Sequence, residues 1–246
     1  MSVSTKIPAV TLAFWVMKIC ATTLGETAGD LLSMTLNIGY ALSTLVLLGF
    51  FLATLLVQLA AKKYQPVVFW AVILSTSTAG TTLSDYMDRT LGLGYASGSL
   101  LLATLLGLTL VVWKVSEKSL SVISISSFKG ELFYWTAILF SNTLGTALGD
   151  LISDNSGLGF AGGALLIGSL LSLIVFAHYF TKLSSVLLFW MAFVLTRPFG
   201  ATFGDLLTKS HEKGGLNFGT IGSSAILFSV LALLVAAAFF KENKRA

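Results

Sequence analysis

Eight long apolar stretches with few charged residues dominate the pattern of the chain. They lie at roughly 8–25, 38–61, 66–84, 93–113, 132–149, 158–180, 184–204 and 216–240. Each is long enough to cross a bilayer as an α-helix, which needs about 20 predominantly apolar residues. The pattern predicts an all-α integral membrane protein whose eight transmembrane helices form a single transmembrane domain over residues 1–246.

One short motif recurs four times along these stretches. In each copy an aromatic residue precedes a tryptophan, a glycine follows the tryptophan by ten residues, and an aspartate follows it by fifteen. The tryptophans are Trp15, Trp70, Trp135 and Trp190, the glycines are Gly25, Gly80, Gly145 and Gly200, and the aspartates are Asp30, Asp85, Asp150 and Asp205. This register predicts four parallel two-helix repeats, approximately 8–61, 66–113, 131–180 and 184–240, in a pseudo-fourfold or two-by-two arrangement.

Composition and the placement of charge agree with a membrane protein. Of the 246 residues, 55% are hydrophobic and 11% are charged, whereas charged residues make up about a quarter of a typical soluble domain. Lysine and arginine concentrate in the two tails and the even-numbered connections, so the positive-inside rule predicts that both termini are cytoplasmic. The net charge of +4 therefore reflects topology, and we expect no nucleic-acid partner.

Polar residues recur on one face of the first helix of each repeat. At about 100° per residue, the tryptophan and the positions seven, eleven and fifteen residues later share one stripe. After the tryptophan the stripes contain Thr22, Glu26 and Asp30; Ser77, Thr81 and Asp85; Asn142, Thr146 and Asp150; and Arg197, Ala201 and Asp205. Because polar groups are costly in hydrocarbon, we expect this face to point into the bundle.

The stripes suggest a pathway for a small cation, such as a divalent metal ion. Carboxylates supply the hard oxygen ligands that such ions bind, and the ligands would be Asp30, Asp85, Asp150, Asp205 and Glu26. The residues expected to line the pathway are Thr22, Ser77, Asn142, Thr81 and Thr146. Lys18 and Arg197 would act as coupling groups or counter-charges, because basic residues inside spans are functional candidates by default.

Structural interpretations of the same residues stay open. The four aspartates are also suited to end their helices at the membrane boundary, and Glu26 to form a buried structural ion pair. Lys18 is long enough to extend its amine to the inner interface. Arg89, next to Asp88, has the pattern of a solvated loop charge.

The glycines and tryptophans are expected to pack. Small residues recur four apart in every predicted span, as in Gly25 and Gly29, which is typical of close helix contacts in membranes. The four repeated tryptophans are interpreted as packing or interfacial aromatic residues. The single cysteine, Cys20, excludes an internal disulfide.

The repeated aromatic-tryptophan signature, from about Phe14 to Phe240, resembles that of a bacterial family of membrane-anchored proteins of unknown function. That family is built from four tandem repeats, each with two transmembrane segments and a characteristic tryptophan. The resemblance implies this fold and a multi-pass location in the bacterial inner membrane. It implies no activity.

Two further functions stay open beside cation transport. One is a non-transporting membrane receptor or scaffold, and the other is a carrier of a small anionic or zwitterionic solute that uses Arg197 and Lys18. No catalytic motif is recognisable, so an enzyme is not expected. The expected partners are the lipid bilayer and a small ion or solute, with a homo-oligomer left open; no cofactor is expected other than a bound metal cation.

Overall fold

The computed structural model describes residues 6–122, 125 and 127–244. These residues form helices and no strand. The long helices are α1 (Leu12–Asp30), α2 (Tyr40–Ala60), α3 (Pro66–Asp85), α4 (Tyr95–Glu117), α5 (Phe128–Asp150), α6 (Gly159–Phe180), α7 (Ser185–Thr208) and α8 (Thr220–Asn243). The first and second helix of each predicted repeat are therefore present in all four copies.

Local sequence explains where these helices begin and end. The Thr11 and Ser127 side chains accept hydrogen bonds from the backbone N–H groups of Phe14 and Gly130, which caps the N-termini of α1 and α5. Pro66 occupies the first turn of α3, where its missing N–H costs nothing. Wide π turns, η1 (Leu31–Thr35), η2 (Tyr86–Thr90) and η4 (Leu151–Asn155), directly follow α1, α3 and α5.

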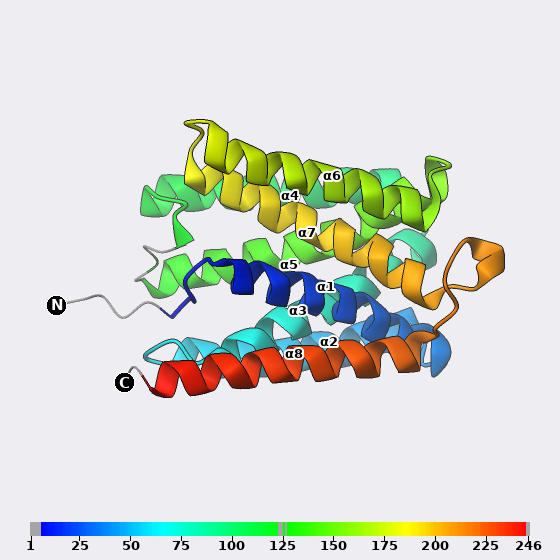
Figure 1. The fold of residues 1–246 in the computed structure, drawn as a ribbon, viewed down its shortest axis with the longest axis horizontal. Helices are drawn as coiled ribbons and strands as arrows, with labels where there is room; N and C mark the ends of the chain where they lie inside the picture. The colour runs from blue at the N-terminus through cyan, green and yellow to red at the C-terminus, as the bar shows by residue number, and fades with distance from the viewer. Residues whose placement is uncertain (1–5, 123–124, 126, 245–246) are drawn as a thin grey trace.

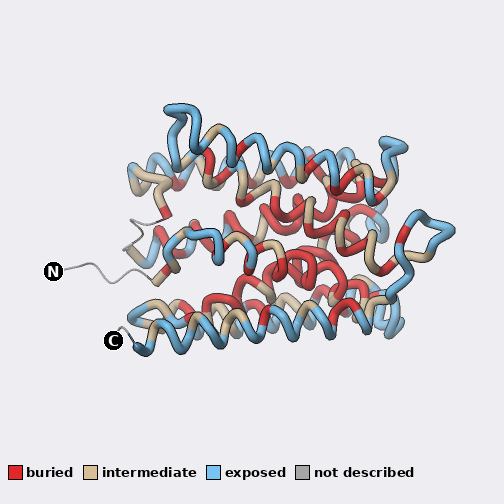
Figure 2. Tube along the Cα trace, in the orientation of Figure 1, coloured by how far each residue is buried: buried red, intermediate tan, exposed pale blue. Residues whose placement is uncertain are grey.

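Four helices form an interior ring. α1 packs against α3, α3 against α5, α5 against α7, and α7 against α1. Their buried residues form the red interior of Figure 2, whereas the outer helices are largely exposed. The N-terminal ends of the ring helices lie near both chain termini, and their C-terminal aspartates lie at the opposite end (Figure 1). We name these the termini end and the aspartate end.

The second helix of each repeat packs on the first helix of the next repeat. α2 lies on α3, α4 on α5, α6 on α7, and α8 on α1. In Figure 1, α1, α2, α3 and α8 lie below α4, α5, α6 and α7. We call α1, α2, α3 and α8 the first helix group, and α4, α5, α6 and α7 the second.

The four repeated glycines lie at the contacts within the ring. A Cβ atom added at Gly25 would lie 2.5 Å from the Ser77 Cβ, and one at Gly145 would overlap the Arg197 side chain. Gly80 is placed in the same way against Asn142, and Gly200 against Thr22. Each glycine thus allows one ring helix to approach the residue seven positions after the tryptophan on the next.

Aromatic rings join the same helices at the termini end. The aromatic residue before each tryptophan approaches the tryptophan of a neighbouring ring helix, with centroids 5.6 Å apart for Phe14 and Trp70 and for Phe69 and Trp135. The corresponding distances are 6.5 Å for Tyr134 and Trp190 and 5.7 Å for Phe189 and Trp15. Three of these tryptophans are buried and Trp15 is half-buried. These eight aromatic residues, which we call the aromatic layer, therefore pack neighbouring ring helices against one another.

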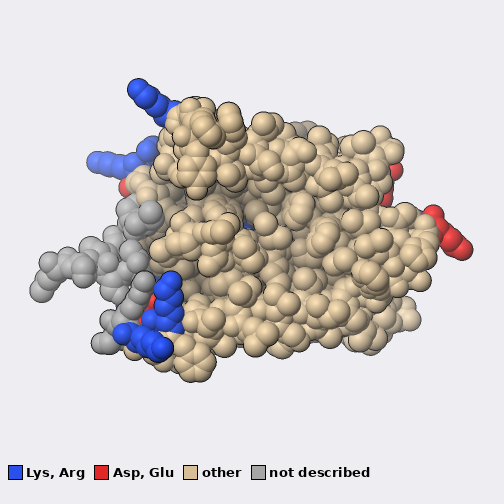
Figure 3. Space-filling model, viewed as in Figure 1, with Lys and Arg blue, Asp and Glu red and all other residues tan. Residues whose placement is uncertain are grey.

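In the described part of the chain, six helical segments are long and apolar enough to cross a membrane. They comprise α2, α3 with η2, α4, α6, α7 and α8. The sequence predicted eight such spans, and α1 and α5 are not in this group; both lie in the ring, where buried polar side chains such as Lys18 and Asn142 replace apolar ones. Most of the Lys and Arg side chains visible in Figure 3 gather at the termini end.

Candidate functional site

The four repeated aspartates are buried at the aspartate end of the ring. Each is only 2–3% exposed, and together they face two cationic side chains. Arg89 lies 3.0 Å from an Asp85 oxygen through Nε and 2.9 Å from an Asp150 oxygen through Nη2. We call these aspartates with Arg89 and Lys209 the aspartate layer.

Lys209 joins the other two aspartates of this layer. Its Nζ lies 2.5 Å from an oxygen of Asp30 and 3.0 Å from an oxygen of Asp205. Burial lowers the pKa of Lys209, but the negative charges of Asp205 and Asp30 outweigh it, so the pKa is raised and the amine stays charged at neutral pH. With every group ionised, four carboxylates share two cations, and negative charge is in excess.

A second ionic contact lies next to the aspartate layer. Both terminal nitrogens of Arg197 lie 3.0 Å from the same Glu26 oxygen. The Thr81 and Thr146 hydroxyls also contact this guanidinium and Glu26. Arg197 is fully buried and Glu26 is 3% exposed. We call Glu26 and Arg197 the central pair.

The central pair and the aspartate layer come together on α1 and α7. One carboxylate oxygen from each of Glu26, Asp30 and Asp205 lies within 4.8 Å of the others, close enough to hold one metal ion. Carboxylates are suitable ligands for a hard cation. In this structure the Lys209 amine lies between two of the three, so a metal ion would have to compete with it.

Lys18 is a buried basic side chain on the termini side of the central pair. Its Nζ lies 3.3 Å from the Asn142 Oδ1 and 4.2 Å from the centroid of the Phe193 ring. Asn142 in turn donates to the Thr76 hydroxyl at 2.9 Å. No carboxylate of residues 6–122, 125 or 127–244 lies within 4.0 Å of this amine. Glu26 pairs with Arg197, the other basic residue predicted as a counter-charge.

The two remaining residues predicted to line the pathway, Thr22 and Ser77, pack between ring helices. The Thr22 hydroxyl donates to the backbone carbonyl of Lys18 at 3.0 Å and contacts that of Thr196 at 3.2 Å. Ser77 is fully buried against Gly25, and its hydroxyl has no hydrogen-bond partner in the described part of the chain.

Arg89 and Lys209 were not identified as site residues from the sequence. The interpretation of Arg89 as a solvated loop charge is wrong, because it binds two buried aspartates. A signal was present: the position four residues after the repeated aspartate holds Met34, Arg89, Asp154 and Lys209. Alignment of the four copies on the aspartate would have placed a cation one turn after it in repeats two and four.

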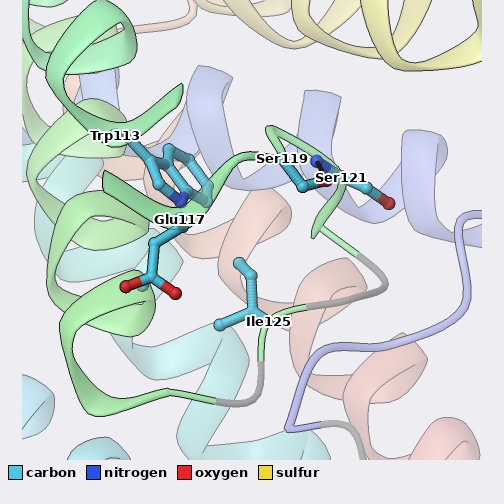
Figure 4. Close-up of a pocket in the computed structure, with 6 residues that line it drawn as sticks. Trp113, Glu117, Ser119, Ser121 and Ile125 are labelled. Carbon is cyan, nitrogen blue, oxygen red and sulfur yellow. Dashed lines mark hydrogen bonds between the residues drawn. The ribbon is translucent and has the colours of Figure 1, made fainter. Parts of the chain in front are cut away.

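A small pocket lies away from this site, at the termini end (Figure 4). Its volume is about 40 Å³, and it is lined by Trp113, Glu117, Ser119, Ser121, Ile125 and Gly130. Ligand pockets usually measure about 300–1,000 Å³. This pocket is therefore much smaller than a usual ligand pocket.

Comparison with known proteins identifies the repeats. Residues 13–64, 68–119, 133–184 and 188–244 each match a family model described as a Repeat of Unknown Function (DUF347). No curated protein and no solved structure matches the chain. The chain therefore belongs to the DUF347 repeat family, of which it carries four tandem copies.

Proposed function

We propose that the protein transports a small cation across the bacterial inner membrane, with both termini in the cytoplasm. The observation that carries the proposal is the aspartate layer, in which four buried carboxylates share two cations. When its four carboxylates are ionised the layer carries excess negative charge, which in a low-dielectric interior attracts protons or metal cations strongly. The outer helices support membrane insertion through exposed apolar side chains, including Leu45, Leu100, Leu165 and Leu233.

An ion from the aspartate end can reach these carboxylates. The side chains of Arg89 and Lys209 are 30% and 18% exposed, so both remain in contact with solvent at that end. A cation that displaces either side chain gains two carboxylate ligands, and Glu26 lies next to one of these sites. The central pair is the next charged contact inward, within the pseudo-fourfold ring of a bundle that has eight transmembrane helices in all.

Two observations favour a second candidate, a carrier of a small anionic or zwitterionic solute. Lys18 is fully buried without a described carboxylate in contact, and the Nε of Arg197 has no hydrogen-bond partner among the described residues. A solute carboxylate or phosphate would supply the missing acceptor. In this alternative, the aspartates balance the charge of the bundle and are not the ligands.

We expect the variant Asp150→Asn to reduce cation uptake into proteoliposomes at least tenfold, because it removes one ligand from the aspartate layer. Uptake is measured separately for Na⁺, K⁺, Mg²⁺, Mn²⁺ and Ca²⁺, with an internal dye that reports pH. Asp154→Asn is the matched control, since this exposed acid lies four residues later. It should transport like the parent protein.

Two other results would separate the alternatives. A bound cation should raise the thermal unfolding midpoint, because a ligand stabilises the fold by mass action. If no cation is taken up and none raises this midpoint, the transport proposal fails and a receptor or scaffold becomes the better explanation. Acetate, phosphate and glycine serve as anionic and zwitterionic probes. Loss of their binding in Arg197→Gln, with normal binding in Asp150→Asn, would favour the solute carrier.

A further inference from the structure

The two helix groups are held together very differently at the two ends of the molecule. Both chain connections that cross between the groups, η2 to α4 and α7 to α8, lie at the aspartate end. The first of them is short, since only residues 91–94 separate η2 from α4. Covalent structure therefore limits how far the groups can separate at the aspartate end.

Reciprocal ion pairs strengthen this same end. Arg89, from the first group, binds Asp150 of the second, and Lys209, from the second group, binds Asp30 of the first. Each cation also binds the aspartate four residues earlier in its own segment. The Arg89–Asp150 pair therefore joins α3 to α5, and the Lys209–Asp30 pair joins α7 to α1. These are the two places where ring helices of different groups meet.

The termini end has weaker connections between the groups. One ion pair crosses there in the described part of the chain: the Lys6 Nζ lies 2.7 Å from a Glu131 oxygen, and the Lys6 side chain is 27% exposed. Inward of the tryptophans, Lys18 and Thr76 of the first group hydrogen-bond Asn142 of the second group. Aromatic rings also meet across the groups at this end, Phe189 with Phe14 at 6.4 Å, Phe189 with Trp15 at 5.7 Å, and Phe69 with Trp135 at 5.6 Å. Ring contacts slide and separate without leaving buried charges unpaired.

We propose that the aspartate end is the hinge and the termini end is a gate. When the Lys6–Glu131 pair and the aromatic contacts separate, the two helix groups open toward the cytoplasm while Arg89 and Lys209 hold the other end. The opening uncovers Lys18, which lies three residues inward of Trp15 and contacts Asn142 and Phe193, both in the second group. A role of this gate in transport rests on the proposed function, whereas the hinge and the gate are inferred from the contacts alone.

Cysteine accessibility tests this gate in the full-length protein. Cys20→Ala first removes the single native cysteine. Ser141→Cys then places a thiol of similar size at a fully buried position in α5, six residues or almost two helical turns inward of Trp135. A membrane-impermeant thiol reagent is added from the termini side, and the labelling rate is measured. Lys6→Gln should raise the rate at least tenfold, whereas Lys6→Arg, which keeps the charge, should leave it at the parental value.

A second reporter separates gating from general loosening of the fold. Ala201→Cys places a thiol in the ring near the aspartate end, and Lys6→Gln should not change its labelling. Equal acceleration in the Ala201→Cys and Ser141→Cys reporters, or no acceleration in the Ser141→Cys reporter, would overturn the proposal. If Lys6→Gln protein cannot be purified, Glu131→Gln tests the same contact from the other partner.

The outcome is independent of the transport assay. Faster labelling of the Ser141→Cys reporter in a protein that moves no cation would keep the gate and reject cation transport. Unchanged labelling in a protein with normal cation uptake would reject the gate and keep the proposed function.

Discussion

Glu26→Gln is expected to destabilise the protein by about 3–5 kcal/mol, which is the usual cost when one partner of a buried ion pair is removed. Arg197 is fully buried, and both of its terminal nitrogens contact the Glu26 carboxylate. Without that carboxylate its charge is left in a low-dielectric interior with only neutral partners, Thr81, Thr146 and the Ser77 carbonyl. The cost arises from the uncompensated charge more than from the lost contact.

A double-mutant cycle distinguishes this explanation from a simple packing defect. Arg197→Met, Glu26→Gln and the double variant are compared with the parent by denaturant unfolding in detergent micelles. Removing both charges should restore much of the stability, because an apolar replacement of a buried pair is often close to neutral. Asp154→Asn, at an exposed acid, should change the free energy of unfolding by less than about 0.5 kcal/mol. Additive losses in the double variant would contradict the role assigned to the central pair.

The sequence was sufficient to locate the helices and the repeats. Fourfold recurrence of tryptophan, glycine and aspartate at fixed spacing fixes the helical register, and that register places the stripe residues on one face. Glu26 of repeat one and Arg197 of repeat four both lie on these stripes, although at positions eleven and seven. Their contact therefore depends on the closure of the ring between α7 and α1.

The partners of the helices and charges could not be read from the pattern. An apolar helix surface fits lipid and protein equally well, so hydropathy does not reveal that α2 packs on α3 and α8 on α1. Lys209 and Asp30 are 179 residues apart, and only the closed ring brings them together. The local sequence therefore indicated that Arg89 is solvated, although the fold buries Asp85 and Asp150, the two acids that Arg89 binds.

Gly200→Ala should destabilise the protein by about 2–3 kcal/mol, in the upper part of the range for overpacked cores. The added Cβ would lie 2.6 Å from the Thr22 hydroxyl oxygen and 2.8 Å from the Thr22 backbone carbon. A side chain can rotate away from such a contact, but a backbone carbon can move only with its helix. The substitution therefore pushes α7 away from α1, along the contact that also holds the central pair and the Lys209–Asp30 pair.

Gly107→Ala is the matched control, because a Cβ at this position in α4 meets no atom within 4 Å. Alanine has the higher helix propensity, so this variant should be as stable as the parent or more stable by up to about 1 kcal/mol. Both variants are compared by denaturant unfolding in the same detergent. Thr22→Ala, added to Gly200→Ala, should recover only part of the loss, since it removes the hydroxyl and leaves the backbone contact. Equal stabilities of Gly200→Ala and Gly107→Ala would mean that α1 and α7 are not packed as closely as this ring requires.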